Sequence, residues 1–146
     1  MKDWKKCMVV SYRAFDGRRS GEFVVRVAGT FREKLEGLLR TPREEAGCLV
    51  LLGCRSVHTF GMKYPLDVAL VGKGRVRRAM RAVEPGAVVY EEAASYVLER
   101  PASDDPWLLP GDKVELRMPP EGLLAQDEAA GQPASMGTRE RSEVAA

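Results

Sequence analysis

The strongest constraint on the fold is a series of short runs rich in valine and leucine, each followed within two residues by glycine, proline or a charged residue. Glycine, proline and aspartate favour turns, whereas branched and aromatic side chains favour extended backbone. Repeated short strands with turns between them are typical of an antiparallel sandwich or a partly open barrel. We therefore predict a mainly β fold of this class. Its strands after residue 47 should be Cys48–Leu52, Asp67–Val71, Val76–Val83, Val88–Tyr90, Tyr96–Leu98 and Val114–Arg117.

One further strand and one helix are predicted before these runs. Phe23–Val27 has β-type composition, and the turn pair Asp16-Gly17 would allow it to fold back on Met8–Tyr12 as a hairpin. Residues 30–40 begin with the spacing of a capping box and place apolar side chains on one stripe, before Thr41-Pro42 ends the pattern. We therefore predict one N-terminal amphipathic helix. Its stripe consists of Phe31, Leu35, Leu38 and Leu39.

The length and composition allow one domain with an extension at each end. A chain of 146 residues with 45% hydrophobic and 30% charged content can form one core. We assign residues 20–118 to a single β-rich domain and residues 1–19 to an N-terminal segment that could supply a hairpin strand. Residues 119–146 begin with Pro119-Pro120 and contain no aromatic side chain, so we predict a flexible polar tail.

Charge and cysteine content argue against several classes of function. The net charge is +2 and residues 20–118 are nearly balanced, so the domain has no overall field for nucleic acid or a membrane. The three cysteines are an odd number, which favours reduced thiols, and no apolar run approaches the roughly 20 residues needed to cross a bilayer. The lysine-rich N-terminus lacks the apolar run of a signal peptide. We expect a soluble, cytoplasmic protein.

The densest group of polar and aromatic residues lies between residues 54 and 67 and includes the only histidine. Pro65 favours extended backbone before it, and the strand that follows is apolar on both faces. Asp67 should therefore lie near the core, where a carboxylate must be paired or hydrogen-bonded. Asp67 could hold loop N–H groups, contact a ligand or act as an acid or base. The candidate ligand-binding residues are His58, Met62, Lys63 and Asp67.

Two more specific kinds of site have weaker support. Cys54 and His58 could form a nucleophilic pair, but residues four apart in extended backbone are roughly 13 Å apart, at about 3.3 Å per residue. Cys7 and Cys48 would complete a zinc ligand set with these two residues, but no CxxC pair occurs and the ligands come from distant segments. We therefore expect no catalytic residue of this kind, no metal and no cofactor.

A basic run between residues 73 and 81 is the best candidate for binding polyanions. Positive charge on a strand and turn more often protects an edge or faces solvent, and no aromatic residue is interleaved to stack on bases. Nucleic acid is therefore not the expected partner, and the partner is otherwise unknown. The candidate polyanion patch consists of Lys73, Arg75, Arg77, Arg78 and Arg81.

The segment Ser56–Ala69 resembles the family catalogued as domain of unknown function 192, in which a Gly-Met-Lys/Arg element precedes Pro-Leu/Ile-Asp. The resemblance covers residues 23–117. The other matching elements are the helix over Phe31–Arg40, the strand Gly47–Leu51, the Val97-Leu98-Glu99 element and the turn Pro110-Gly111-Asp112.

The resemblance implies a compact, mainly β, sandwich-like fold and supplies no activity. Met62, Lys63, Pro65 and Asp67 match the signature of the family, while His58 belongs to a subgroup with a Val-His-Thr-Phe-Gly-Met element. Many members carry a tryptophan and an Asn-Thr pair around the Met-Lys element, where this chain has Phe60-Gly61 and Tyr64 directly before Pro65.

Three functions follow as hypotheses. The first is a non-enzymatic binding module for a small or anionic ligand or a peptide, in which Lys63 contacts an anionic group. The second is an enzyme that uses Asp67 or His58 as acid or base, which requires both side chains to converge within about 3 Å of a common point. The third is an interaction protein that binds polyanions through residues 73–81, and its binding should weaken steeply with salt.

Overall fold

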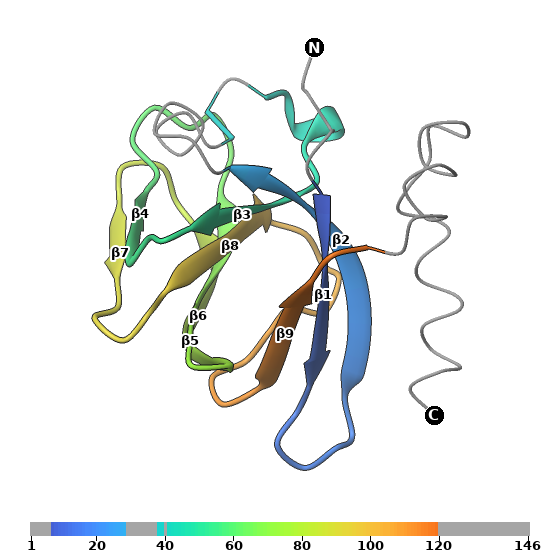
Figure 1. Cartoon of the computed structure of the whole chain (residues 1–146). Coiled ribbons are helices and arrows are strands. Elements are labelled where there is room, and N and C mark those ends of the chain that lie inside the picture. Colours follow the sequence, from blue (N-terminus) through green and yellow to red (C-terminus); the bar gives the residue numbers. More distant parts are fainter. Residues whose placement is uncertain (1–6, 29–37, 40, 120–146) are drawn as a thin grey trace.

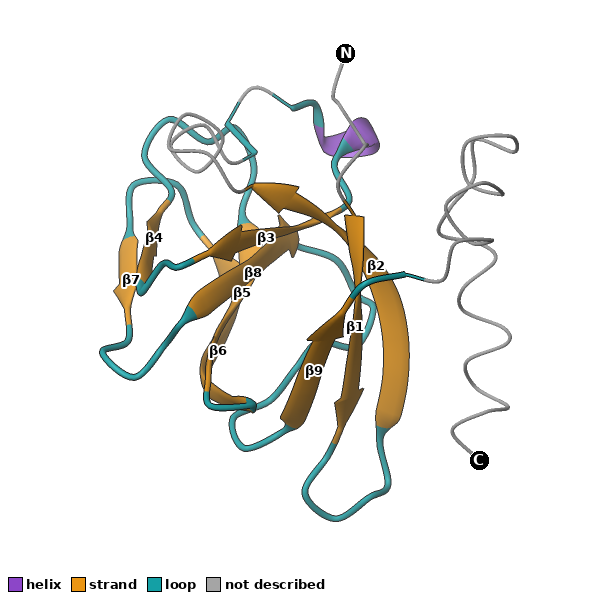
Figure 2. Ribbon diagram, viewed as in Figure 1, coloured by secondary structure: helices purple, strands orange, loops and turns teal. Residues whose placement is uncertain are grey.

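The computed structural model describes residues 7–28, 38–39 and 41–119, which form a β-barrel with a two-stranded ribbon beside it (Figure 1). Within this part of the chain, the helical structure consists of one short 3-10 turn, η1 (Arg43–Glu45) (Figure 2). No helix of this part is long and apolar enough to cross a membrane. The strands are β1 (Cys7–Arg13), β2 (Ser20–Ala28), β3 (Cys48–Leu52), β4 (Ser56–His58), β5 (Leu66–Gly72), β6 (Arg75–Val83), β7 (Val88–Tyr90), β8 (Tyr96–Pro101) and β9 (Lys113–Arg117).

The barrel closes in the order β1-β2-β3-β8-β5-β6-β9. β1 and β2 form a hairpin around Asp16-Gly17, and β1 also pairs with β9 along most of its length. The contact between β6 and β9 is a single pair, Arg75 and Lys113. The turn before β9 continues this contact, because the Val76 N–H donates to the Asp112 carbonyl and the Gly111 N–H donates to the Val76 carbonyl.

The mainly β prediction is confirmed, but the predicted fold class is wrong. The sheet closes into a barrel instead of forming an antiparallel sandwich or a partly open barrel, and β2 and β3 pair in parallel. The described residues contain no α-helix. The predicted amphipathic helix falls mostly on residues 29–37 and 40, which lie outside the described residues, and Leu38 and Leu39 lie in a turn. Short-range periodicity carries no information about which distant strands pair, so it could not predict closure.

Two apolar clusters lie on opposite faces of the barrel sheet. The inner cluster draws on all seven barrel strands and includes Trp107, so it fills the barrel. The outer cluster lies between the faces of β3, β5 and β8 and the β4–β7 ribbon that covers them, and it includes Leu38 and Met62. β5 contributes to both clusters and is buried along its whole length, which explains why it is apolar throughout except for Asp67.

Candidate functional site

The four residues proposed as a ligand site are placed in different environments. Met62 is 8% exposed and packs in the outer cluster, and Asp67 is 0% exposed on β5. His58 and Lys63 face solvent. In the described part of the chain, no hydrogen bond or ion pair connects either exposed residue to Asp67. Cys54 packs against the outer cluster, whereas the His58 ring lies against Phe60 with 5.5 Å between ring centroids.

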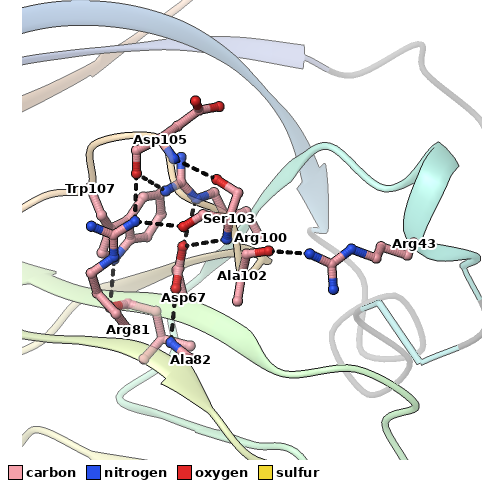
Figure 3. Close-up of polar contacts among 10 residues, drawn as sticks. Arg43, Asp67, Arg81, Ala82, Arg100, Ala102, Ser103, Asp105 and Trp107 are labelled. Atoms are coloured by element: carbon pink, nitrogen blue, oxygen red, sulfur yellow. Dashed lines mark hydrogen bonds and ion pairs between the residues drawn. The ribbon is translucent and has the colours of Figure 1, made fainter.

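Asp67 lies in a polar cluster where β5, β6 and β8 meet the connection between β8 and β9 (Figure 3). Its Oδ1 accepts from the Ala82 N–H at 2.9 Å. Its Oδ2 accepts from Arg100 Nε at 2.9 Å and from the Ser103 N–H at 3.4 Å. Because three donors and one positive charge meet a fully buried carboxylate, these contacts account for its burial without any ligand.

Arginines from three elements hold the same connection through its carbonyl oxygens, as Figure 3 shows. Arg43 donates to the Ala102 carbonyl and Arg81 donates to those of Ser103 and Asp105. Arg100 also donates to the Asp105 carbonyl, and its guanidinium lies 4.5 Å from the centre of the Trp107 ring.

Trp107 completes this arrangement. Its side chain is 6% exposed in the inner cluster, and its indole N–H donates to the Val68 carbonyl at 2.9 Å. We call Asp67, Arg81, Arg100 and Trp107 the barrel-end clasp. Its hydrogen bonds fix residues 102–107 against the barrel, so the clasp contributes to folding and presents no free acid or base.

The basic run at residues 73–81 also makes internal contacts. Arg75 donates to the Gly111 carbonyl, Arg77 donates to the Gly72 carbonyl, and Arg81 belongs to the clasp. Lys73 and Arg78 face solvent. Several of these guanidinium groups therefore stabilise turns, and the run does not form a uniform row of free positive charges.

The β4–β7 ribbon presents a different kind of surface. Val57 and Val89 are opposite each other and point inward to the outer cluster. The Thr59 N–H donates to the Ala87 carbonyl and the Glu91 N–H donates to the Arg55 carbonyl. Hydrogen-bonded pairs alternate along an antiparallel ladder, so the Val57–Val89 pair is also hydrogen-bonded. The intervening pairs, Ser56 with Tyr90 and His58 with Val88, therefore direct their backbone N–H and C=O groups toward the two edges of the ribbon.

The side chains of those same intervening residues point to solvent. Val88 is 61% exposed and Tyr90 is 55% exposed, and Phe60, which follows the ribbon, is 53% exposed. Neither ribbon strand pairs with any other strand in the described part of the chain. We call Ser56, His58, Phe60, Val88 and Tyr90 the ribbon surface.

Thr59 fixes the position of the ribbon surface. It is 0% exposed, and its hydroxyl donates to the Glu84 carbonyl at 2.7 Å while accepting from the Ala87 N–H at 2.8 Å. Its carbonyl also accepts from the N–H groups of Met62 and Gly86. The turn between β6 and β7 is therefore tied to the end of β4, so the ribbon surface is held in place despite the shortness of its strands.

A second group of polar residues, which the sequence reasoning did not select, lies on the outer face of the barrel. Glu99 is 2% exposed, and it shares a row across the sheet with Leu49 on β3 and Arg26 on β2. Burial raises the pKa of Glu99 to about 7, while a hydrogen bond from the Leu38 N–H and the charge of Arg26 lower it. In the sequence, the only feature that pointed to Glu99 was its place in the Val97-Leu98-Glu99 element of the family resemblance.

Tyr64 joins this group from the segment before β5. Its hydroxyl donates to the Thr41 carbonyl at 2.6 Å and to the Leu38 carbonyl at 3.4 Å. Its pKa is raised, first by burial and then by the charge of Glu99. Thr41 is 3% exposed, and its own hydroxyl has no hydrogen-bond partner in the described part of the chain. We call Arg26, Thr41, Tyr64 and Glu99 the outer polar cluster.

Metal and thiol chemistry have little support in this geometry. Among the described residues, no group of three or more histidine, cysteine, aspartate or glutamate side chains could hold a metal ion. All three cysteines are free. Cys48 is only partly exposed, and the desolvation of its thiol raises its pKa to about 12, so the thiol stays protonated near neutral pH.

The family model described as "Uncharacterized ACR", domain of unknown function 192, matches residues 14–116. A crystal structure of a candidate transcription regulator from Sinorhizobium meliloti 1021 superposes with a TM-score of 0.64 at 19% identity, covering 80% of this chain and 98% of that chain. A protein of unknown function from Novosphingobium aromaticivorans DSM 12444 gives a TM-score of 0.56 at 24% identity, covering 73% and 83% respectively. No curated protein matches the chain. At these identities, the structural likeness establishes the fold alone.

Proposed function

Because the chain belongs to domain of unknown function 192, a family whose description names no activity, we propose a function from the chain's own surface: a non-enzymatic module that binds an extended peptide segment along the β4–β7 ribbon. The observation that carries this proposal is the coincidence of two features in the same residues. Ser56, His58, Val88 and Tyr90 turn their side chains to solvent and direct their backbone groups to an edge of the ribbon.

This coincidence favours a peptide over other ligands. An exposed strand edge binds an extended segment through main-chain hydrogen bonds, and neighbouring side chains then select its sequence. The ribbon offers both parts of that recognition, since Val88, Tyr90 and Phe60 supply apolar and aromatic contact area next to the free edge groups. A surface patch that served only solubility would not place large apolar side chains at more than half of their full exposure beside unpaired strand edges.

The partner should be an extended segment with apolar residues at alternate positions. Alternate side chains of a strand point to one face, so every second residue of the partner would meet the ribbon surface. The strands are only three residues long, so the interface is small. We therefore expect a weak, transient complex with a Kd on the order of 10–100 μM.

The test is selection of a phage-displayed library of random dodecapeptides on the immobilised full chain, followed by titration of a selected peptide into the ¹⁵N-labelled protein. We expect the largest amide shift changes at one edge pair, either Ser56 and His58 or Val88 and Tyr90. Shift changes confined to the barrel-end clasp or to residues 73–81 would contradict the proposal.

Proline substitutions identify the edge without removing the exposed apolar surface. Val88→Pro removes an outward N–H of β7, and Ser56→Pro removes one of β4, while the Val57–Val89 pair keeps its hydrogen bonds. We expect one of these two variants to lose binding at least tenfold and the other to retain it. Equal binding by both variants would overturn β-strand addition.

A side-chain control distinguishes specific binding at the ribbon from non-specific binding to exposed aromatic side chains. Phe15 is 87% exposed in the turn between β1 and β2, and Figure 1 shows that this turn lies away from the β4–β7 ribbon. We expect Tyr90→Ser to weaken peptide binding and Phe15→Ser to leave it unchanged. An equal loss of affinity in both variants would mean that the selected peptides bind any exposed aromatic side chain.

A further inference from the structure

The two strands of the β4–β7 ribbon lie in segments of opposite charge. Residues 53–66, which contain β4, have no aspartate or glutamate, and their basic side chains are those of Arg55, His58 and Lys63. Residues 84–98, which contain β7, have no lysine, arginine or histidine, and their acidic side chains are those of Glu84, Glu91 and Glu92. Each strand forms one edge of the ribbon, so the two edges adjoin charges of opposite sign.

The acidic side of the ribbon faces solvent without counterions. Glu84 and Glu92 are exposed, and Glu91 is partly exposed. Within the described residues, none of these carboxylates forms an ion pair. The Glu91 carboxylate accepts from the Ala93 N–H at 3.2 Å, so it also holds the turn after β7. The carboxylates of Glu84 and Glu92 therefore remain available to a partner at the two ends of β7.

The edge of β7 also lies beside the larger apolar contact area. Val88 and Tyr90 are on β7 itself, at 61% and 55% exposure. A segment added at this edge would lie about 4.8 Å away and pair its side chains directly with theirs. A segment added at the edge of β4 would instead meet Ser56 and His58, with the β7 side chains one strand farther away. An apolar partner therefore gains more from the β7 edge.

We propose that the partner of the ribbon is a cationic extended segment that adds to the edge of β7, with lysine or arginine residues near Glu84 and Glu92. Its apolar residues lie opposite the exposed side chains of β7. This inference rests on the peptide-binding function proposed above and specifies the edge and the charge of the partner. The same segment is disfavoured at the other edge, because Arg55 and Lys63 would repel it.

The charges of the ribbon have a simpler role to be weighed against this one. Charged side chains protect exposed strand edges from pairing with other chains. Protection alone needs no separation of the two signs, since charges of either sign would serve on both strands. In this ribbon each strand lies in a segment of one sign, and large apolar side chains stay exposed on the acidic strand. Such an arrangement discriminates between partners by their charge.

The first experiment compares three synthetic peptides with one core of alternating valine and threonine, flanked by lysine, by glutamate or by serine. Each peptide is titrated into the ¹⁵N-labelled full chain at low salt. We expect the lysine-flanked peptide to bind at least about fivefold more tightly than the glutamate-flanked one, because each exposed ion pair changes affinity by about two- to fivefold. Its largest amide shift changes should be at Val88 and Tyr90, and its advantage should shrink at high salt.

The outcomes separate this inference from the function on which it rests. If the glutamate-flanked peptide binds the ribbon at least as tightly as the lysine-flanked one, the cationic partner is refuted while peptide binding at the ribbon stands. Largest shift changes at Ser56 and His58 would likewise refute the β7 edge alone. If none of the three peptides shifts a ribbon amide, the proposed function fails and this inference fails with it.

Substitutions on the acidic side give a second readout. Glu84 and Glu92 lie outside the strands, and their carboxylates make no hydrogen bond in the described part of the chain, so Glu84→Gln with Glu92→Gln should fold normally. We expect this double variant to bind the lysine-flanked peptide about four- to tenfold more weakly and the serine-flanked peptide unchanged. Glu115→Gln, the matched control, removes an exposed carboxylate from β9 and should change neither affinity.

Reversal of the charges completes the test. Glu84→Lys with Glu92→Lys should prefer the glutamate-flanked peptide over the lysine-flanked one, because the sign beside the β7 edge is then inverted. An unchanged preference for lysine in this variant, or an equal loss of affinity in Glu115→Gln, would overturn the inference.

Discussion

Removing the charge of Asp67 should destabilise the fold far more than removing the charge of an exposed ion pair. Asp67→Asn keeps the size of the side chain but replaces one carboxylate oxygen by an NH₂ group. That group cannot accept from Arg100 or from the N–H groups of Ala82 and Ser103, which all converge on the carboxylate. The substitution therefore leaves the Arg100 charge without its counterion and places extra donors in a buried site.

The structure sets the size of the effect. The side chains of Asp67 and Arg100 are 1% and 17% exposed, and breaking such a buried pair from one side costs about 3–5 kcal/mol. Arg100 keeps its contacts with the Asp105 carbonyl and the Trp107 ring, which moderates the loss. We therefore expect a decrease of about 3 kcal/mol in the free energy of unfolding, at the low end of that range.

The assay is urea unfolding, compared at equal m values, with Glu22→Gln as the matched control. Glu22 accepts from Arg117 at 2.7 Å, but these side chains are 23% and 43% exposed, so its substitution should cost less than about 1 kcal/mol. Arg100→Met added to Asp67→Asn should recover part of the loss, since the stranded charge is then gone. A loss of less than about 1 kcal/mol in Asp67→Asn would refute the structural role of the clasp.

Two further predictions concern packing and thiol chemistry. A Cβ atom at Gly72 would lie 1.7 Å from the Ala93 carbonyl oxygen, so Gly72→Ala should lower the free energy of unfolding by more than about 3 kcal/mol. Gly86 has a φ of 92° and nothing within 4 Å of its Cβ position, so Gly86→Ala should cost only about 1 kcal/mol. Equal losses for the two variants in urea unfolding would contradict this reasoning. Because the pKa of Cys48 is raised to about 12, its alkylation by iodoacetamide at pH 8 should be at least about 100-fold slower in the native chain than in urea, as measured by mass spectrometry, and similar rates would show that its burial is not protective.

Most strands were predictable from the sequence because their signals are local, but β4 (Ser56–His58) was not among those predicted. Val88–Tyr90 coincides with β7, and Cys48–Leu52 coincides with β3, since branched side chains and flanking turn residues determine extended backbone over a few positions. Closure of the barrel was not predictable. It depends on the pairing of β1 with β9 and of β2 with β3. Local sequence patterns within a strand do not indicate which distant strand it pairs with.

The environment of Asp67 was partly predictable. Apolar residues on both faces of its strand indicate burial, and burial requires a partner for the carboxylate. Arg100 lies 33 residues further along the chain, and sequence spacing could not identify it as that partner. The burial of Glu99 was harder still to predict. A glutamate followed by an arginine near a strand end resembles a solvated pair in the sequence. Its cross-strand neighbours, Leu49 and Val68, are brought beside it only by the pairing of β3, β8 and β5.

The two faces of the barrel sheet differ in how completely their polar groups are hydrogen-bonded, and this difference is consistent with the proposed peptide site on the outer layer. At the barrel end, the carboxylate and guanidinium groups of the clasp meet one another or nearby carbonyls, so that region has a sufficient explanation in stability. The outer layer contains the buried Glu99, the Thr41 hydroxyl, which has no hydrogen-bond partner among the described residues, and the exposed side chains of the ribbon surface. A Cβ atom on Gly61 would lie 3.2 Å from the Leu39 side chain, so Leu39 lies close to the residue that follows Phe60. Leu39 and the segment that follows Phe60 therefore pack in the same outer layer as the ribbon surface, where we propose that the peptide binds.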